Sequence, residues 1–345
     1  MAVKMRDEKL DLLAVVACFL VVLCHECGNY AAESFITGQT YRDLFCILAE
    51  VAVPLFVMKS GVLFLNPQRQ ISMVQMTKKC LKLLSVIVVW GMLYNLTSNT
   101  LIYGFSLEIV FDSLKSVVIA DTSFGYHLWH LYMLLGLYII VPVLKRFTDI
   151  APKREFLWCI AFLLAESCII PFMCKIVGMD ADTFWGTKFF GGYGDYLLYF
   201  LLGAYLYRYP LAKNTRIILA SMLIVATFFC VNEVLRGSDD RIWMTYMSPF
   251  TVLYAAIAFD TLMRVDVSPQ KARNRYLAQI ADASFGIYII HVMVIVVVRK
   301  VIGVDCSWAS ALISVPLMTV LTWSACCALV MAINRVTILK KIVLW

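Results

Sequence analysis

Ten ionisable side chains lie inside strongly apolar stretches of the sequence, where a charge is costly and therefore marks a functional candidate. They are Asp11, His25, Glu50, Lys59, His127, His130, Glu166, Asp195, Asp260 and His291. His25 is the sharpest candidate, because an imidazole takes up and releases protons near neutral pH. It lies fourteen residues after Asp11, a spacing that puts both side chains on one helix face about 21 Å apart. Ala14 and Cys18 lie on the same face between them. The alternative is a core histidine that hydrogen-bonds a neighbouring helix.

The composition indicates which kind of molecule must position these side chains. Hydrophobic residues make up 62% of the 345, charged residues only 15%, and the mean hydropathy is +0.82. The apolar residues occur in runs of about 20, the length that crosses a bilayer. A soluble enzyme, a disordered chain, a nucleic-acid-binding domain and a disulfide-stapled secreted module are therefore excluded. Most of the twelve cysteines lie in the apolar runs and are interpreted as core residues.

The apolar runs predict an all-α polytopic membrane protein, with residues 1–345 forming a single transmembrane domain. The ten expected spans are 10–28, 44–65, 80–101, 127–147, 156–177, 192–208, 215–234, 243–263, 280–301 and 308–334. Residues 106–120 carry an apolar face at helical spacing, which predicts an interfacial helix. The first run has no cleavage site for a signal peptide, so we expect the N-terminus to be retained.

The lysines and arginines predict the orientation of these spans. With the N-terminus inside, 21 of the 30 fall on the inner side and 8 on the outer side, and Lys59 lies within the second span. Both termini are therefore expected in the cytoplasm, and the chain is expected to be a multi-pass protein of the inner (cytoplasmic) membrane. The same bias accounts for the formal net charge of +7, so no nucleic-acid partner is expected. We find no internal repeat typical of a transporter.

Four segments in order along the chain carry a further signal: RDEKLDLLAVVACFLVVLCH (6–25), VPLFVMKSG (53–61), HLW (127–129) and SFGIYIIH (284–291). Together they resemble the membrane acyltransferase family 3, the integral membrane O-acyltransferases of bacterial envelope sugars. The resemblance implies transfer of an acyl group, commonly acetyl from cytoplasmic acetyl-CoA, to a hydroxyl of a sugar or lipid-linked glycan at the outer face. Acyl-CoA would be a co-substrate, with no permanently bound cofactor and with membrane lipid as the surroundings.

The resemblance also suggests roles for individual residues. His25 matches the family's catalytic histidine and would act as a general base, with Asp11 as the second catalytic candidate. Lys79 and Lys82 stand where the family has an Arg-x-x-Arg and would bind the phosphates of CoA. The alternative is that they only flank the helix on its cytoplasmic side, as the positive-inside rule predicts. The acceptor or acyl pocket would use His127, Trp129, Ser60 and Glu50. An interfacial aromatic anchor is the alternative for His127 and Trp129.

The sequence departs from the family pattern at several positions. Ala14 stands where an arginine is usual, and Glu50 and Lys59 replace an arginine and an apolar residue. Ala14 and the lysines at positions 79 and 82 keep open a catalytically inactive relative that acts as a sensor or partner. Ten helices with a few buried charges would also suit a transporter or flippase for a lipid-linked or acylated sugar.

Metal and redox interpretations of the remaining motifs are weaker. Cys24 and Cys27 form a C-x-x-C, and His127 and His130 are spaced to share zinc, but we predict no metal site. Glu166 and His291 are interpreted as structural residues of the core.

Overall fold

The computed structural model describes residues 6–28, 36–123, 125–179, 192–236, 245–267, 271–304 and 308–335, and all regular structure in these ranges is helical. The α-helices are α1 (Glu8–Gly28), α2 (Ile36–Ala49), α3 (Ala52–Leu65), α4 (Met73–Tyr103), α5 (Leu107–Val118), α6 (Trp129–Ile150), α7 (Lys153–Leu164), α8 (Ile170–Ile176), α9 (Leu197–Arg208), α10 (Lys213–Leu235), α11 (Pro249–Arg264), α12 (Lys271–Val297) and α13 (Ala311–Arg335). Short 3-10 turns precede α6 (Tyr126–Leu128) and α9 (Gly192–Tyr196), and π turns follow α7 (Ala165–Ile169) and α12 (Val298–Ile302). The protein is an all-α membrane protein.

Eight helical stretches of the described chain are long and apolar enough to cross a bilayer. They are Glu8–Gly28, Thr40–Leu65, Met73–Thr100, Tyr126–Ile150, Lys153–Ile176, Lys213–Leu235, Arg275–Ile302 and Ala311–Arg335. The other two expected spans, 192–208 and 243–263, correspond to the shorter helices α9 and α11. Ten crossings therefore stay a prediction. Among the lysines and arginines that predict the orientation, five lie outside the described residues: Lys4, Lys188, Arg241, Lys340 and Lys341.

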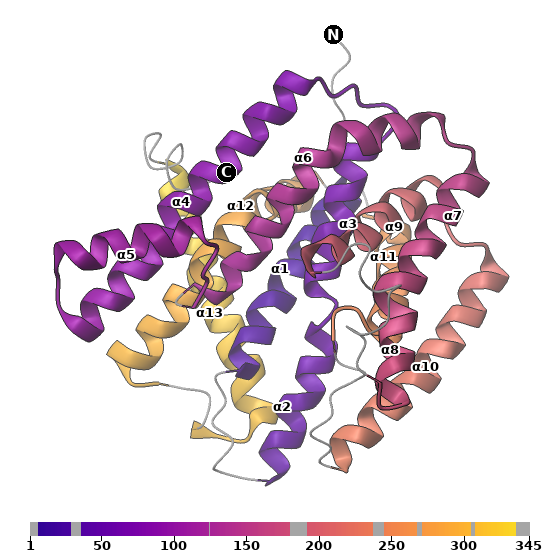
Figure 1. The fold of residues 1–345 in the computed structure, drawn as a ribbon. Helices are drawn as coiled ribbons and strands as arrows, with labels where there is room; N and C mark the ends of the chain where they lie inside the picture. The colour runs from indigo at the N-terminus through magenta and orange to yellow at the C-terminus, as the bar shows by residue number, and fades with distance from the viewer. Residues whose placement is uncertain are drawn as a thin grey trace.

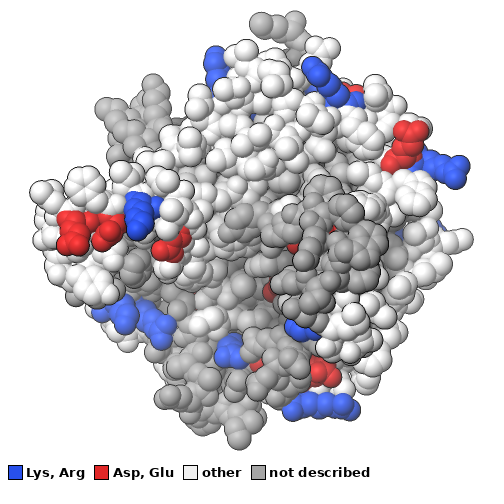
Figure 2. All heavy atoms as spheres, in the orientation of Figure 1, with Lys and Arg blue, Asp and Glu red and all other residues white. Residues whose placement is uncertain are grey.

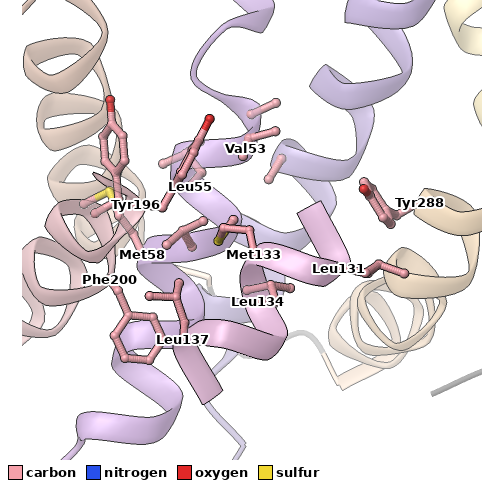
Figure 3. Packing of buried hydrophobic residues seen from close by; sticks show 14 of the residues in the cluster. Val53, Leu55, Met58, Leu131, Met133, Leu134, Leu137, Tyr196, Phe200 and Tyr288 are labelled. Atoms are coloured by element: carbon pink, nitrogen blue, oxygen red, sulfur yellow. The ribbon is translucent and has the colours of Figure 1, made fainter. Parts of the chain in front are cut away.

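The helices form one bundle in which α1 and α3 lie at the centre (Figure 1). Helix α1 packs against α12, α3, α2 and α13, and α3 packs most extensively against α9. Figure 3 shows side chains of α3, α6, α9 and α12 meeting in this core, among them Val53, Leu55, Met58, Leu131, Met133, Leu137, Phe200 and Tyr288. In Figure 2 the visible charged side chains lie mainly towards the two ends and over α5, as expected for a chain that exposes its middle to lipid.

Two glycines bring α3 and α9 unusually close together. A Cβ added at Gly61 of α3 would lie 1.8 Å from the carbonyl oxygen of Phe200, and one at Gly203 of α9 would lie 2.3 Å from the carbonyl oxygen of Met58. Small residues permit this backbone approach between membrane helices, where van der Waals packing drives association. The site residues on α3 are therefore held against a neighbour that has little room to move.

The second expected span, 44–65, corresponds to the stretch Thr40–Leu65, which is interrupted within the bilayer because α2 ends at Ala49 and α3 begins at Ala52. Pro54 explains the interruption. It has no N–H to donate to the carbonyl of Glu50, and its ring would collide with that carbonyl in a regular helix. The break turns the backbone around Glu50 and Val51 at the level of His25.

Two other helices begin earlier than the hydropathy pattern predicts. Helix α4 begins at Met73, where Ser72 and Gln75 form a reciprocal capping box with bonds of 3.2 and 3.1 Å. Helix α12 begins at Lys271, nine residues before the apolar run. In both cases the helix continues beyond the apolar stretch. The predicted interfacial helix 106–120 is α5, which is capped by the Ser106 side chain and exposes Leu107, Phe111 and Val118.

Segments predicted to face the cytoplasm meet at one end of the bundle, called the inner end below. Arg208 donates to the carbonyl oxygens of Thr148 (2.6 Å) and Leu65 (3.3 Å), which joins the ends of α9, α6 and α3. The Tyr207 hydroxyl donates to Asp7 over 2.7 Å at the start of α1. The shared end agrees with the alternation of inner and outer segments, while the cytoplasmic location of the termini stays a prediction.

Candidate active site

Three of the four histidines meet near the outer end of α1. The His25 ring lies 4.8 Å from that of His291 on α12 and 6.3 Å from that of His127, and the His127 and His291 rings are 5.1 Å apart, all between centroids. Tyr126 closes a further side of His25, with ring centroids 5.1 Å apart. Residues from α1, the turn before α6 and α12 thus form one imidazole cluster, consisting of His25, His127 and His291.

Backbone carbonyls fix the ring orientation of two cluster members. His127 Nε2 lies 3.1 Å from Ile289 O, and His291 Nδ1 lies 2.6 Å from Tyr288 O. Because a carbonyl can only accept, these nitrogens donate, which leaves His127 Nδ1 and His291 Nε2 as acceptors. Both acceptor atoms are buried and have no hydrogen-bond partner in the part of the chain that the structure describes. A hydroxyl brought into this cluster would supply the missing donor.

Two tyrosines hold the cluster in place. Tyr94 of α4 donates to Ile289 O (2.8 Å) and accepts from the N–H of Met293 (3.2 Å), so it bridges one turn of α12. Tyr288 of α12 donates to the backbone oxygen of His127. Together these bonds tie α4, the Tyr126–Leu128 turn and α12 to one another.

A small chamber of about 30 Å³ lies beside His25. Its walls come from α1, the α2–α3 junction, α6, α12 and the stretch before α11, and they are Val21, Cys24, His25, Ala49, Ala52, Val53, His127, Trp129, His130, Tyr246 and Tyr288. Trp129 belongs to an aromatic group, since its ring lies 5.3 Å from Tyr196 and 5.8 Å from Tyr246. The predicted pocket residues His127 and Trp129 therefore lie together with His25.

An inner cavity of about 430 Å³ approaches this chamber from the other side. Residues of α3, α4, α6, α12 and α13 line it, among them Phe56, Lys59, Ser60, Leu63, Tyr138, Asp282, Ser284 and Asn334. His130 and Tyr288 line both the cavity and the chamber, and their rings are 5.5 Å apart. These two buried side chains form the partition between the two spaces.

A groove of about 1000 Å³ at the inner end carries the basic side chains Arg69, Lys78 and Lys79, and shares Leu63 with the inner cavity. Lys79, one of the two predicted donor-binding residues, lies in this groove with its Nζ 5.4 Å from the ring centre of Phe64. Lys82, the other one, is exposed one turn further along α4 and does not line the groove. The structure thus brings one of the pair to a basic surface near the inner cavity.

Of the remaining predicted site residues, Asp11 and Ser60 lie apart from His25, whereas Glu50 acts electrostatically on Cys24, the residue before His25. Asp11 is at the inner end of α1, where it pairs with Arg6; Arg6 also binds Asp282 over 2.9 Å. These hydrogen bonds raise the pKa of the Arg6 guanidinium above its usual range. Ser60 lies in the inner cavity, and Glu50 lies at the α2–α3 break, within electrostatic reach of Tyr246.

Sequence reasoning assigned no site role to several residues that the structure places beside His25. His291 was interpreted as a core residue, and its bond to Tyr288 O fits that interpretation, yet its ring is the one nearest to His25 among the histidines. Tyr94, Tyr126 and Tyr288 lie in apolar runs where an aromatic residue is unremarkable. Only the SFGIYIIH segment signalled two of these positions, Tyr288 and His291.

The arrangement suits proton transfer. Within the described ranges no three His, Cys, Asp or Glu side chains are placed to hold a metal ion, and Cys24 and Cys27 form no disulfide. His25 instead faces a space that can hold a few atoms, with imidazole acceptors around it and cavities leading towards it. A group that loses a proton on reacting, such as a hydroxyl, fits this environment.

Comparison with known proteins supports acyl transfer in general. The model of a family described as an acyltransferase domain matches residues 7–333. A viral protein named "Putative acetyltransferase ORF330", from Acidianus two-tailed virus, is 25% identical over 229 residues. That match covers 63% of this chain and 63% of the relative, so the chain spans slightly less than two thirds of that protein. No solved structure matches the chain significantly.

Proposed function

The chain belongs to the membrane acyltransferase family 3, and on that premise we propose that it moves an acyl group from cytoplasmic acyl-CoA to a hydroxyl of an envelope sugar or related acceptor at the outer face. The observation that carries this proposal is the position of His25 in the small chamber, separated from the inner cavity only by His130 and Tyr288. The donor would come through the cavity and the acceptor from the opposite side, in the inner membrane of the cell.

The proposed chemistry needs one base. As the acceptor oxygen attacks the thioester carbonyl, His25 takes the hydroxyl proton; the C–S bond then breaks and the departing thiolate receives the proton from the imidazolium. The products are an ester and free CoA, with no change in oxidation state. Transfer through an acyl-enzyme would use the same proton exchange in two stages.

The chamber volume favours a short acyl group. About 30 Å³ has room for about two or three water-sized groups, which suits the methyl and carbonyl of acetyl and not a long acyl chain. The same volume supports an enzyme over a flippase, because a lipid-linked sugar could not pass the partition formed by His130 and Tyr288.

The basic groove supports the donor side of the proposal. Arg69, Lys78 and Lys79 would bind the phosphates of CoA there, while the pantetheine arm extends through the inner cavity towards the partition. Trp129, Tyr196 and Tyr246 would pack against the apolar faces of the acceptor.

The test is acyl incorporation into envelope glycan or lipid-linked sugar in cells that carry His25→Ala. We expect incorporation to fall at least a hundredfold, since removing a general base commonly costs that much. Cys159→Ala, a half-buried change on α7 that lines none of these spaces, is the matched control. Equal thermal stability of the two purified variants shows that His25→Ala still folds.

Other outcomes would select the competing hypotheses. Unchanged acylation in His25→Ala refutes the assignment of the base. Movement of an acceptor across the membrane without modification indicates a transporter. Failure to bind CoA, together with normal cellular function of His25→Ala, indicates an inactive relative.

A further inference from the structure

Lys59 is a cation on the wall of the membrane-embedded inner cavity. It lies one turn from Phe56 on α3, and Phe56 contacts both residues of the partition, with ring centroids 6.4 Å from His130 and 6.4 Å from Tyr288. One turn of helix is about 5 Å, so the Lys59 backbone lies about one turn from the partition, while its ammonium is within electrostatic reach of Asp11 and Asp282 towards the inner end.

The described part of the chain offers Lys59 no ion pair within 4.0 Å and no hydrogen bond. The carboxylates that act on it electrostatically are Asp11 and Asp282. Arg6 already occupies both, donating to Asp11 and to each oxygen of Asp282 at 3.0 and 2.9 Å. The ammonium of Lys59 therefore faces the cavity without a protein anion in contact.

An ammonium in this position is unfavourable unless something compensates for it, and a charged residue inside a membrane protein normally marks a ligand or ion path. The rest of the cavity wall combines apolar side chains with neutral polar ones, and its carboxylate, Asp282, pairs with Arg6 over 2.9 Å. A long, mostly uncharged ligand with one anionic group matches this distribution.

We propose that Lys59 binds an oxyanion of the acyl donor inside the inner cavity, and so helps to select the donor. The inference rests on the proposed acyl-CoA reaction and adds to it a binding residue on α3 that is separate from the basic groove. Two parts of a donor supply such an oxyanion: the phosphate at the base of the pantetheine arm, or a carboxylate on the acyl chain. Both form charge-assisted hydrogen bonds with an ammonium.

The test compares binding of three probes to the full-length protein in lipid nanodiscs: acetyl-CoA, S-acetylpantetheine, which lacks phosphate, and succinyl-CoA, which adds a carboxylate. The variant is Lys59→Met, which keeps an unbranched side chain one atom shorter and removes the charge. Lys213→Met makes the same change at an exposed lysine on α10 and is the control. Because the removed charge has no protein partner, we expect Lys59→Met to be at least as stable to heat as the control.

Each source of the oxyanion has its own signature. If Lys59 binds the phosphate, Lys59→Met weakens acetyl-CoA binding about ten- to hundredfold and leaves S-acetylpantetheine unchanged. If it binds the acyl carboxylate, only succinyl-CoA is weakened. Unchanged binding of all three probes, or lower thermal stability as the only effect, overturns the assignment. Failure of the unmodified protein to bind any probe overturns the proposed reaction and the assignment with it.

Discussion

The contact between α3 and α9 leads to a prediction that uses a single added carbon atom. Gly61→Ala would place a Cβ 1.8 Å from Phe200 O and 2.8 Å from Phe200 C. Real Cβ atoms do not approach another atom closer than about 3.0 Å, so the separation must grow by more than 1 Å. The opposing atoms belong to the backbone and cannot rotate away, which means that the two helices themselves must move apart.

The expected cost is large for so small a change. Overpacking a well-packed core costs about 1–3 kcal/mol, and the upper end applies here because no side chain can yield. Gly136 of α6 is the matched control, since nothing lies within 4 Å of a Cβ at that position. Gly136→Ala should be neutral or stabilising by up to about 1 kcal/mol, because alanine is the better helix former.

The assay is the free energy of unfolding in mixed detergent micelles, followed by circular dichroism, together with acyl transfer by the folded fraction. Gly203→Ala should resemble Gly61→Ala, because its Cβ would meet Met58 O at 2.3 Å across the same contact. Once the helices have separated, the second alanine costs little, so the double variant should lose less than the sum of the two. Equal stability of Gly61→Ala and Gly136→Ala would refute the reasoning.

Three further changes probe how the site is held. Tyr94→Phe removes two hydrogen bonds to α12 and should lower the free energy of unfolding by about 1–2 kcal/mol. It should also lower acyl transfer, because His127 shifts. Unchanged transfer would contradict this. Arg6→Gln leaves the Asp11 carboxylate without its ion pair and should lower the free energy of unfolding by about 1–3 kcal/mol. The double variant Arg6→Gln/Asp11→Asn should recover part of that loss. If it recovers none, Asp11 has a role beyond this pair. Pro54→Ala restores a backbone N–H, so α2 and α3 can join into one helix. We expect unchanged or higher thermal stability and reduced acyl transfer, both measured on the same preparation. Full activity would show that the break is not needed.

The sequence predicted the membrane helices well and their ends less well. An apolar run reports the stretch that must avoid water, and α1, α6 and α13 coincide closely with such runs. Helical hydrogen bonding does not stop at that limit, so α4 and α12 begin seven and nine residues earlier than predicted, at Met73 and Lys271. The break before α3 was missed because hydropathy averages over Pro54, although the missing N–H is visible in the sequence.

The site was predictable only where one segment carries the signal. His25 is an ionisable residue in an apolar helix, and the HLW segment pointed to His127 and Trp129, so these three could be named and do lie together. His291 could not be placed beside them, since 266 residues separate it from His25 and no pattern states which helices are neighbours. Lys59 was conspicuous only as a departure from the family pattern, and its meaning depends on a cavity that five helices create.

Helix α3 connects packing to chemistry in this fold. Its first turn, at Ala52 and Val53, lines the chamber beside His25, its middle carries Lys59 on the cavity wall, and Gly61 presses it against α9. Because fourteen residues serve all three purposes, a displacement at Gly61 must also move the chamber wall and the cation. Gly61→Ala should therefore lose more activity than its unfolded fraction explains. If α3 only supported the bundle, the activity of the variant would fall in proportion to the fraction of protein that is unfolded.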